Sequence, residues 1–389
     1  MPGFEVFGEE ERKAINDLFD ANGGILFAHG FDALRKGVYK VREFEAAAAK
    51  KFGIAHAQAV CSGTAALRVA MAALDIGRGD EVIIPAFTFV ATAEAVIQSG
   101  ADLVIVDVDD SLNIAPAAIE AAITGRTRAI IAVHMLGAPA DMAAVGEIAR
   151  RHGLKVIEDA AQAVGATYRG QCIGTIGDVG CFSFDAGKVI ITGEGGMIVT
   201  NDHATFTKAR AYHDHGHEYS TTVGRGEEGA IGEGFNYRMT ELQGAIGIVQ
   251  LGKLDAIVKA QRANKAQLTA LLRELGIGGR WLNDEAGELA DAIVMFFDDR
   301  EATARFLAGL KREGLGTKNV PDAMRWHFAK HWSHMFEKYG WYRESFRTQW
   351  QRSADILERA IALPVMVKMD QARIALIGEK LQKIAREAL

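Results

Sequence analysis

Short apolar runs rich in β-branched residues alternate with amphipathic stretches from about residue 55 to residue 160. The predicted strands are 82–84, 103–106, 129–133 and 155–158. The helices predicted between them are 64–74, 90–98, 115–122 and 141–152. Continuous apolar strands separated by helices are typical of a mostly parallel sheet covered on both faces. The pattern therefore predicts an α/β fold.

The pattern differs on either side of this region. Helices are predicted before it, over 8–22 and 41–52. After it come two short strands with tight turns, 180–184 and 197–200, and then a long helix from about 239 to 274. The remainder contains one clear strand, 292–297, and helices at 301–313 and 368–387. We expect a large domain with its N-terminal segment over residues 1–255 and a smaller α+β domain over 256–389.

Composition excludes several classes of function. The chain has 389 residues, of which 49% are hydrophobic and 24% charged, as in soluble globular proteins. A net charge of -6 without any basic block gives no reason to expect nucleic acid as a partner. No apolar run approaches the length of roughly 20 residues that spans a membrane, and the first residues do not resemble a signal peptide. Three widely spaced cysteines form neither a disulfide framework nor a zinc pattern, so we expect a cytoplasmic protein.

The segment around Lys188 contains the first candidate for chemistry. Residues 183–187, which are small or polar except for Phe184, precede this lysine, and the glycine-rich turn 192–196 follows it. A lysine amine becomes a useful nucleophile where its site favours the neutral form or holds it as a Schiff base. Clustered glycines let the backbone approach a flat ligand. On this segment alone, a solvated lysine beside an ordinary glycine turn explains the pattern equally well.

Three further positions suggest a phosphate and a flat ring. Ser62-Gly63-Thr64 opens a predicted helix, where free N–H groups favour an anion, although an ordinary N-cap explains it better in isolation. Asp159 follows a strand at the edge where open α/β sheets bind ligands. A buried carboxylate there needs a cation such as a protonated pyridine nitrogen, and a helix N-cap is the alternative. Phe89 is placed to stack on a ring, although core packing is its default role.

The order of these segments along the chain resembles that of one family. The segments 62–67, 158–162 and 193–197 are similar to those of the DegT/DnrJ/EryC1/StrS sugar aminotransferases. The resemblance runs from about residue 4 to 260 and more loosely to the C-terminus. It implies a fold-type I transferase that depends on pyridoxal 5′-phosphate (PLP), with a mostly parallel central sheet and a smaller C-terminal α+β domain.

The resemblance also implies a role for each candidate residue. Lys188 would hold PLP as a Schiff base and later move a proton between substrate and cofactor, while Asp159 would keep the pyridine nitrogen protonated. Gln162 would lie near the 3-oxygen of the ring, and Phe89 would cover one face. The phosphate would be bound by Gly63, Thr64 and Ser183. Asn236 would reach the phosphate of the neighbouring subunit, so that a homodimer shares its active sites.

The implied reaction is a ping-pong amino transfer. An amino acid, with L-glutamate as the expected donor, would leave its nitrogen on the cofactor as pyridoxamine 5′-phosphate, and a carbonyl sugar would then accept it. A branch of the family that removes a sugar hydroxyl has histidine in place of the lysine, so Lys188 argues against a PLP-dependent sugar dehydratase. A non-catalytic cofactor sensor would have lost the lysine or gained a DNA-binding module, and neither is seen.

Short segments also resemble a narrower group within the family. Residues 1–5, 183–185, 213–217 and 326–328 are similar to enzymes that aminate C8 of an oxidised 3-deoxy-octulosonate (Kdo) sugar of lipopolysaccharide. We therefore expect an 8-oxo Kdo-type acceptor first, with a nucleotide-linked keto-sugar or a cyclitol ketone as the alternative. Two departures from the family pattern, at 133–137 and 185–187, fall where the substrate pocket is expected.

Three histidines, His213, His215 and His217, alternate along the chain, so an extended strand would place all of them on one side. Three such histidines can bind zinc, but no carboxylate or cysteine stands at ligand spacing, so we expect no metal. The substrate-binding residues that we expect instead are His215, Arg238 and His327, with Arg225 as a further candidate for a carboxylate. We expect Trp326, Trp332 and Trp341 to be core residues rather than a sugar platform.

Overall fold

A computed structural model of the chain describes residues 2–339 and 348–389. In these residues a seven-stranded sheet has the strand order β1-β9-β8-β5-β4-β2-β3. Its strands are β1 His56–Val60, β2 Glu81–Pro85, β3 Asp102–Val106, β4 Thr127–Val133, β5 Lys155–Asp159, β8 Val179–Ser183 and β9 Gly196–Thr200. β9 is antiparallel to both of its neighbours, whereas the other neighbouring pairs are parallel. The mostly parallel sheet predicted from the sequence is therefore confirmed.

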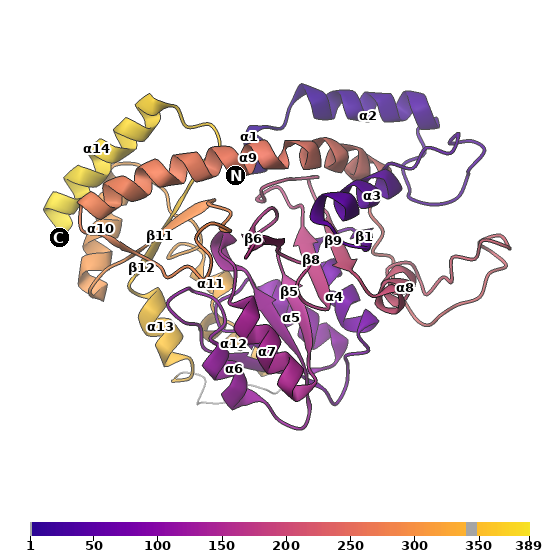
Figure 1. Cartoon of the computed structure of the whole chain (residues 1–389), viewed down its shortest axis with the longest axis horizontal. Coiled ribbons are helices and arrows are strands. Elements are labelled where there is room, and N and C mark those ends of the chain that lie inside the picture. Colours follow the sequence, from indigo (N-terminus) through magenta and orange to yellow (C-terminus); the bar gives the residue numbers. More distant parts are fainter. Residues whose placement is uncertain (1, 340–347) are drawn as a thin grey trace.

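Helices bury both faces of this sheet (Figure 1). Ile84 and Ile131 belong to one core, and their chain neighbours Ile83 and Ile130 belong to the other. The first core includes α4 (Gly63–Ala73) and α5 (Val90–Ser99), and the second includes α3 (Lys40–Phe52), α6 (Pro116–Ala122) and α7 (Met142–His152). Successive strand residues face opposite sides. Burial of both sides therefore explains why these strands are continuous apolar runs.

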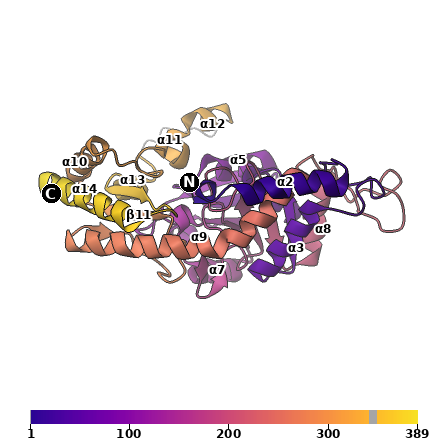
Figure 2. The same cartoon turned by 90° about the horizontal axis from the view of Figure 1, so that it is seen from above.

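The long helix α9, Glu241–Glu274, lies along the edge of the molecule (Figures 1 and 2). It begins at Thr240, whose hydroxyl accepts a hydrogen bond from the N–H of Gln243 in a capping box. Leu254 packs in the core of the large sheet, whereas Leu272 packs in a separate core further along. The predicted helix is confirmed, and the predicted domain boundary at 255 falls inside it and stays a prediction.

The separate core is formed by a three-stranded antiparallel sheet and two helices. The strands are β10 Gly278–Gly279, β11 Ala292–Phe296 and β12 Ala360–Pro364, and the helices are α10 Arg300–Arg312 and α14 Gln371–Ala388. The remaining elements are α1 Pro2–Glu5, α2 Glu9–Asn22, η1 Met135–Gly137, β6 Thr167–Tyr168, β7 Gln171–Cys172, α8 His203–Tyr212, α11 Met324–His327, η2 Ala329–His331, α12 Ser333–Lys338 and α13 Gln351–Leu357.

Part of the C-terminal region packs back onto the large sheet. Phe328 and Trp332 belong to the same core as Ile84, and the indole of Trp332 is fully buried. Trp332 is thus a core residue, as predicted. The same prediction is wrong for Trp326, which is 55% exposed, and Trp341 lies outside the described residues. This packing brings the segment before Phe328 close to the carboxyl ends of the central strands.

Candidate active site

A cavity of about 410 Å³ lies at the carboxyl ends of the central strands. Val133 ends β4, Asp159 ends β5 and Ser183 ends β8, and all three line the cavity. The carboxyl ends of parallel strands meet at one edge of a sheet, which is where ligands of such folds bind. Lys188 lines the same cavity from the loop after β8. The structure therefore brings the predicted lysine and aspartate into one site.

The environment of Lys188 favours its neutral amine more than water would. Its backbone N–H donates to the carbonyl of Asp185 (2.9 Å), which fixes a tight turn before it. Burial lowers the pKa of Lys188 below its ordinary value of 10.5, while the carboxylates of Asp159 and Asp185 oppose that shift. A lysine whose pKa is lowered in this way is a better nucleophile at neutral pH than an exposed one.

The carboxylate of Asp159 is 5% exposed and has two neutral donors. Its Oδ2 accepts from the hydroxyl of Thr92 (2.8 Å), and its Oδ1 accepts from the N–H of Ala161 (3.2 Å). It makes no ion pair with the residues that the structure describes. A buried carboxylate with only neutral partners is costly unless a cation reaches it. The protonated ring nitrogen of PLP is a cation of the right kind, so the site fits that cofactor.

The N-terminus of α4 supplies the anion-binding end of the cavity. The hydroxyl of Ser62 accepts from the N–H of Ala65 (3.0 Å) and caps the helix. The first N–H groups of a helix, here those of Gly63 and Thr64, have no partner within it. A Cβ on Gly63 would lie 2.7 Å from Cβ of Ser183, so glycine allows the helix to meet this serine. Gly63, Thr64 and Ser183 thus converge as the phosphate prediction requires.

Two rings and one amide complete the lining. Phe89 is 43% exposed and so is not a core residue. Its ring lies 5.2 Å, centroid to centroid, from that of His327, which also lines the cavity. Gln162 lies on the same wall, where its Oε1 accepts from the backbone N–H of Leu136 (3.1 Å). These positions are compatible with the predicted roles of Phe89, Gln162 and His327, which stay predictions.

The other predicted residues lie outside this cavity within one chain. Asn236 and His215 are exposed, and neither is part of the cavity lining. Arg238 forms an ion pair with the buried Asp214, as does Arg225 (2.6 Å). Both arginines are thus held by one carboxylate, and their binding of a substrate stays a prediction.

The three alternating histidines do not lie on an extended strand, so the condition that would place them on one side is not met. His213 is the C-cap of α8, and burial lowers its pKa to about 4. His215 has a left-handed φ of 55°, and Nδ1 of His217 pairs with Glu228 (2.7 Å). A helix end followed by a turn does not have the two-residue repeat of a strand. Within 2–339 and 348–389 no group of three or more His, Cys, Asp or Glu side chains is arranged to hold a metal ion.

Several residues of the site were not predicted from the sequence. Thr92 lies one helical turn after Thr88, and the two hydroxyls are 2.7 Å apart beside Asp159. Lys318 and Asn319 reach the cavity from the C-terminal region. Thr92 belongs to a segment that follows a strand end, which is a usable signal. For Lys318 and Asn319 the sequence carries no such signal, because packing of the two regions places them there.

This fold and this cavity define a fold-type I PLP-dependent enzyme. A profile of the DegT/DnrJ/EryC1/StrS aminotransferase family matches residues 31–382. The spore coat polysaccharide biosynthesis protein SpsC of Bacillus subtilis is 34% identical over 395 aligned residues, covering 98% of this chain and 96% of SpsC. The chain belongs to the DegT/DnrJ/EryC1/StrS aminotransferase family, whose cofactor is PLP.

Two other relatives match over part of their length. GDP-perosamine synthase of Caulobacter vibrioides is 47% identical over 56% of this chain and 58% of its own. UDP-N-acetyl-3-dehydro-α-D-glucosamine 3-aminotransferase of Acidithiobacillus ferrooxidans is 49% identical over 53% of this chain and 54% of its own. Both names contain nucleotide-linked sugars, so these relatives give no support to the expected Kdo-type acceptor.

Solved structures agree with the fold. The aminotransferase from Psychrobacter cryohalolentis has a TM-score of 0.87 and 27% identity, with 98% of each chain covered. DesV of S. venezuelae, solved in complex with a ketimine intermediate, has a TM-score of 0.80 and 30% identity over 97% of this chain and 94% of DesV. The family assignment and the fold are therefore consistent over nearly the whole chain.

The electrostatic account of Lys188 predicts a pH dependence in the apoprotein. Only a neutral amine reacts with acetic anhydride, so peptide-level mass spectrometry of labelling against pH reports the pKa of this lysine. We expect a midpoint below 10.5 in the wild type. We expect a still lower midpoint in Asp159→Asn, because the carboxylate that favours the charged form is gone. The exposed Asp298→Asn serves as the control and should leave the midpoint unchanged; an upward shift in Asp159→Asn would contradict the account.

Proposed function

We propose that this protein is a PLP-dependent sugar aminotransferase that moves an amino group from an amino acid to a nucleotide-linked keto-sugar. L-glutamate is the proposed donor. The observation that supports the proposal most is the single cavity shared by the amine of Lys188, the buried carboxylate of Asp159 and the N-terminus of α4. A PLP site requires an amine that forms the Schiff base, a carboxylate that pairs with the protonated ring nitrogen and a site that binds the phosphate.

The residues of the cavity divide the work. When bound, PLP supplies an electron sink that makes the Cα–H bond of an amino acid acidic. Lys188 has an amine of lowered pKa that can take that proton and return it. The carboxylate of Asp159 accepts hydrogen bonds from Thr92 and from the N–H of Ala161, and it would pair with the protonated ring nitrogen of PLP. The N–H groups at the start of α4 would hold the phosphate, and Phe89 would shield the reacting face from water.

The partial relatives support the proposed class of acceptor. GDP-perosamine and the UDP-linked 3-dehydro sugar both occur in the names of proteins that are nearly half identical to this chain over the aligned part. We therefore place a nucleotide-linked keto-sugar ahead of the Kdo-type sugar. Of the segments that resemble the Kdo enzymes, 183–185 and 326–328 contribute Ser183, Asp185 and His327 to the Lys188 cavity, whereas 213–217 does not line it within one chain.

A comparison of acceptors tests this proposal. The purified enzyme loaded with PLP is first converted with L-glutamate, and release of 2-oxoglutarate is measured. It is then given a GDP-linked 4-keto sugar, a UDP-linked 3-keto sugar or oxidised Kdo, and the amino sugar is quantified. We expect kcat/KM for one nucleotide-linked sugar to exceed that for oxidised Kdo by at least about 100-fold, because binding of the nucleotide contributes to the transition state. Equal or faster reaction of oxidised Kdo would overturn the choice of acceptor, and no amine from any sugar would overturn the proposed reaction.

We propose further that the enzyme is a homodimer in which Asn236 completes the partner's site. The chain between α8 and α9 extends away from the sheet (Figure 1). Large apolar side chains are exposed on this segment and on the loop before α3: Phe27, Phe31, Leu34, Val223, Ile231 and Phe235. Apolar surface of this kind marks an interface. Asn236 follows directly on the exposed Phe235 and does not line the cavity of its own chain. In a dimer formed through this surface, its side chain would reach the cavity of the partner.

Hybrid dimers test the shared site. Lys188→Ala and Asn236→Ala homodimers are each expected to be inactive or strongly impaired, the second through weaker binding of the phosphate. Refolding or co-expressing the two variants together gives hybrids in which one site has both native residues. We expect activity to recover to about a quarter of the wild type, since half the dimers are hybrids and half their sites are native. As a control, hybrids of Lys188→Ala with Asp159→Asn should recover no activity, because all native Lys188 residues lie in chains that lack Asp159. No recovery with Asn236→Ala would contradict the shared site.

A cytoplasmic location is part of the proposal. Cys61, Cys172 and Cys181 are free thiols, which supports a reducing compartment. In the described residues, none of the helices combines the length and the apolar character needed to cross a bilayer.

A further inference from the structure

The turn that follows β4 is held in an uncommon backbone conformation. Leu136 has φ 52° and ψ 41°, in the left-handed region, and Gly137 has a φ of 73°. A branched residue rarely adopts that conformation, and it persists where the surroundings fix it. The turn matters for the cavity, because the backbone N–H of Leu136 donates to Oε1 of Gln162 (3.1 Å).

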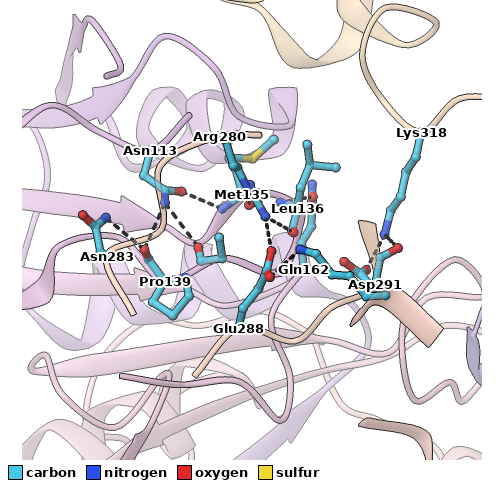
Figure 3. Close-up of polar contacts among 12 residues, drawn as sticks. Asn113, Met135, Leu136, Pro139, Gln162, Arg280, Asn283, Glu288, Asp291 and Lys318 are labelled. Carbon is cyan, nitrogen blue, oxygen red and sulfur yellow. Dashed lines mark hydrogen bonds and ion pairs between the residues drawn. The ribbon is translucent and has the colours of Figure 1, made fainter. Parts of the chain in front are cut away.

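The C-terminal region supplies the groups that fix this turn (Figure 3). Arg280 donates from Nη1 to the carbonyl of Met135 (2.8 Å) and from Nη2 to the carbonyl of Leu136 (2.7 Å). Two carbonyls held by one planar guanidinium leave the intervening peptide little freedom to rotate. A peptide flip at this point would withdraw the N–H that Gln162 receives.

Arg280 is itself held rigidly. Its side chain is 2% exposed, and Nη2 also donates to Oε1 of Glu288 (2.9 Å). The other oxygen of Glu288 pairs with Lys265. The next residue, Leu289, donates its backbone N–H to the carbonyl of Gly137 (2.9 Å). The turn is therefore held by Leu289 and by the buried Arg280, and Glu288 holds Arg280 in place.

The clamp has a consequence for the Gln162 amide. Only the oxygen end of a side-chain amide can accept a hydrogen bond, so the N–H of Leu136 assigns the end of Gln162 that faces it as Oε1. Nδ2 of Asn319 lies 3.4 Å from the same oxygen, as a second donor. Because Leu136 and Asn319 both donate to Oε1, the amide NH2 is the group that Gln162 can offer to a ligand in the cavity.

We infer that Arg280 is a positioning residue for the cofactor, acting through the turn 135–137 to keep the Gln162 amide oriented as a hydrogen-bond donor toward the ring. The inference rests on the proposed PLP chemistry. Arg280 does not line the Lys188 cavity, so this buried arginine of the C-terminal region would act on the cofactor only through the orientation of Gln162.

A double-mutant cycle on cofactor binding tests this inference. The dissociation constant of PLP is measured on the apoproteins of the wild type, Arg280→Met, Gln162→Leu and the double variant. Removal of outer-shell partners costs about 10- to 100-fold in metal sites, and we expect at least a tenfold weaker binding for Arg280→Met. If Arg280 acts through Gln162, the same substitution should have almost no further effect in the Gln162→Leu background. Additive losses in the double variant would overturn the inference.

Two further measurements separate positioning from folding and from the proposed function. Hydrogen exchange of apoprotein should show faster exchange at the Leu136 amide in Arg280→Met, with partial protection in Arg280→Lys, which can still reach one carbonyl. Arg273→Met is the matched control, because Arg273 lies in the same region and pairs with Glu285 while 72% exposed. Unchanged exchange and binding in Arg280→Met, with a wild type that binds PLP, would overturn the inference alone. A wild type that binds no PLP would instead overturn the proposed function.

Discussion

The carboxylate of Asp159, buried at the end of β5, imposes the strongest physical constraint on this protein. Burial of a charge whose hydrogen-bond donors are both neutral is unfavourable, and among the described residues this carboxylate forms no ion pair that would offset the cost, so the site suits a cationic group of a ligand. The same negative charge opposes the desolvation of Lys188 and keeps the pKa of its amine from falling further. The aspartate and the lysine line one cavity, and the charge of the aspartate is part of the electrostatic environment of the lysine.

The fold makes this arrangement possible because strands end where ligands bind. β4, β5 and β8 are parallel neighbours, and their carboxyl ends place Val133, Asp159 and Ser183 along one edge. The helix dipole of α4 and its unpaired N–H groups then provide the positive end that a phosphate needs. The C-terminal region contributes Lys318 and Asn319 to the cavity lining. It also fixes the turn 135–137, whose N–H group bonds to Gln162. The two regions thus share one site rather than supplying separate functions.

The success of sequence prediction follows the physical origin of each element. Strands buried on both faces are continuous apolar runs, so β2, β3, β4 and β5 could be predicted. β1 could not, because its strand includes His56 and the buried Gln58, whose amide bonds to Glu45 (2.7 Å) and breaks the apolar pattern. α8 and β12 were also missed. The alternating histidines after α8 do not share one side, because a helix end and a left-handed residue do not preserve a strand repeat.

The site shows the same division. Asp159 ends β5 and Gly63 begins α4, so both could be chosen as candidates from the predicted elements, at whose ends ligand chemistry concentrates. Lys188 lies in the loop between β8 and β9 and was chosen because of the glycine-rich turn that follows it. Lys318, Asn319 and Arg280 reach the site or its supporting turn through contacts between segments far apart in the chain, and local patterns do not contain such contacts. The identity of the sugar belongs to this second kind of information. Relatives that match over about half of their length narrow it to nucleotide-linked sugars as a proposal.

Mapping the lysine that binds PLP tests the account most directly. The protein is incubated with PLP, reduced with borohydride and digested, and the modified peptide is identified by mass spectrometry. The account predicts stoichiometric modification of Lys188 and loss of the visible absorption band in Lys188→Ala. Modification of a different lysine, or a visible and reducible band that persists in Lys188→Ala, would contradict it.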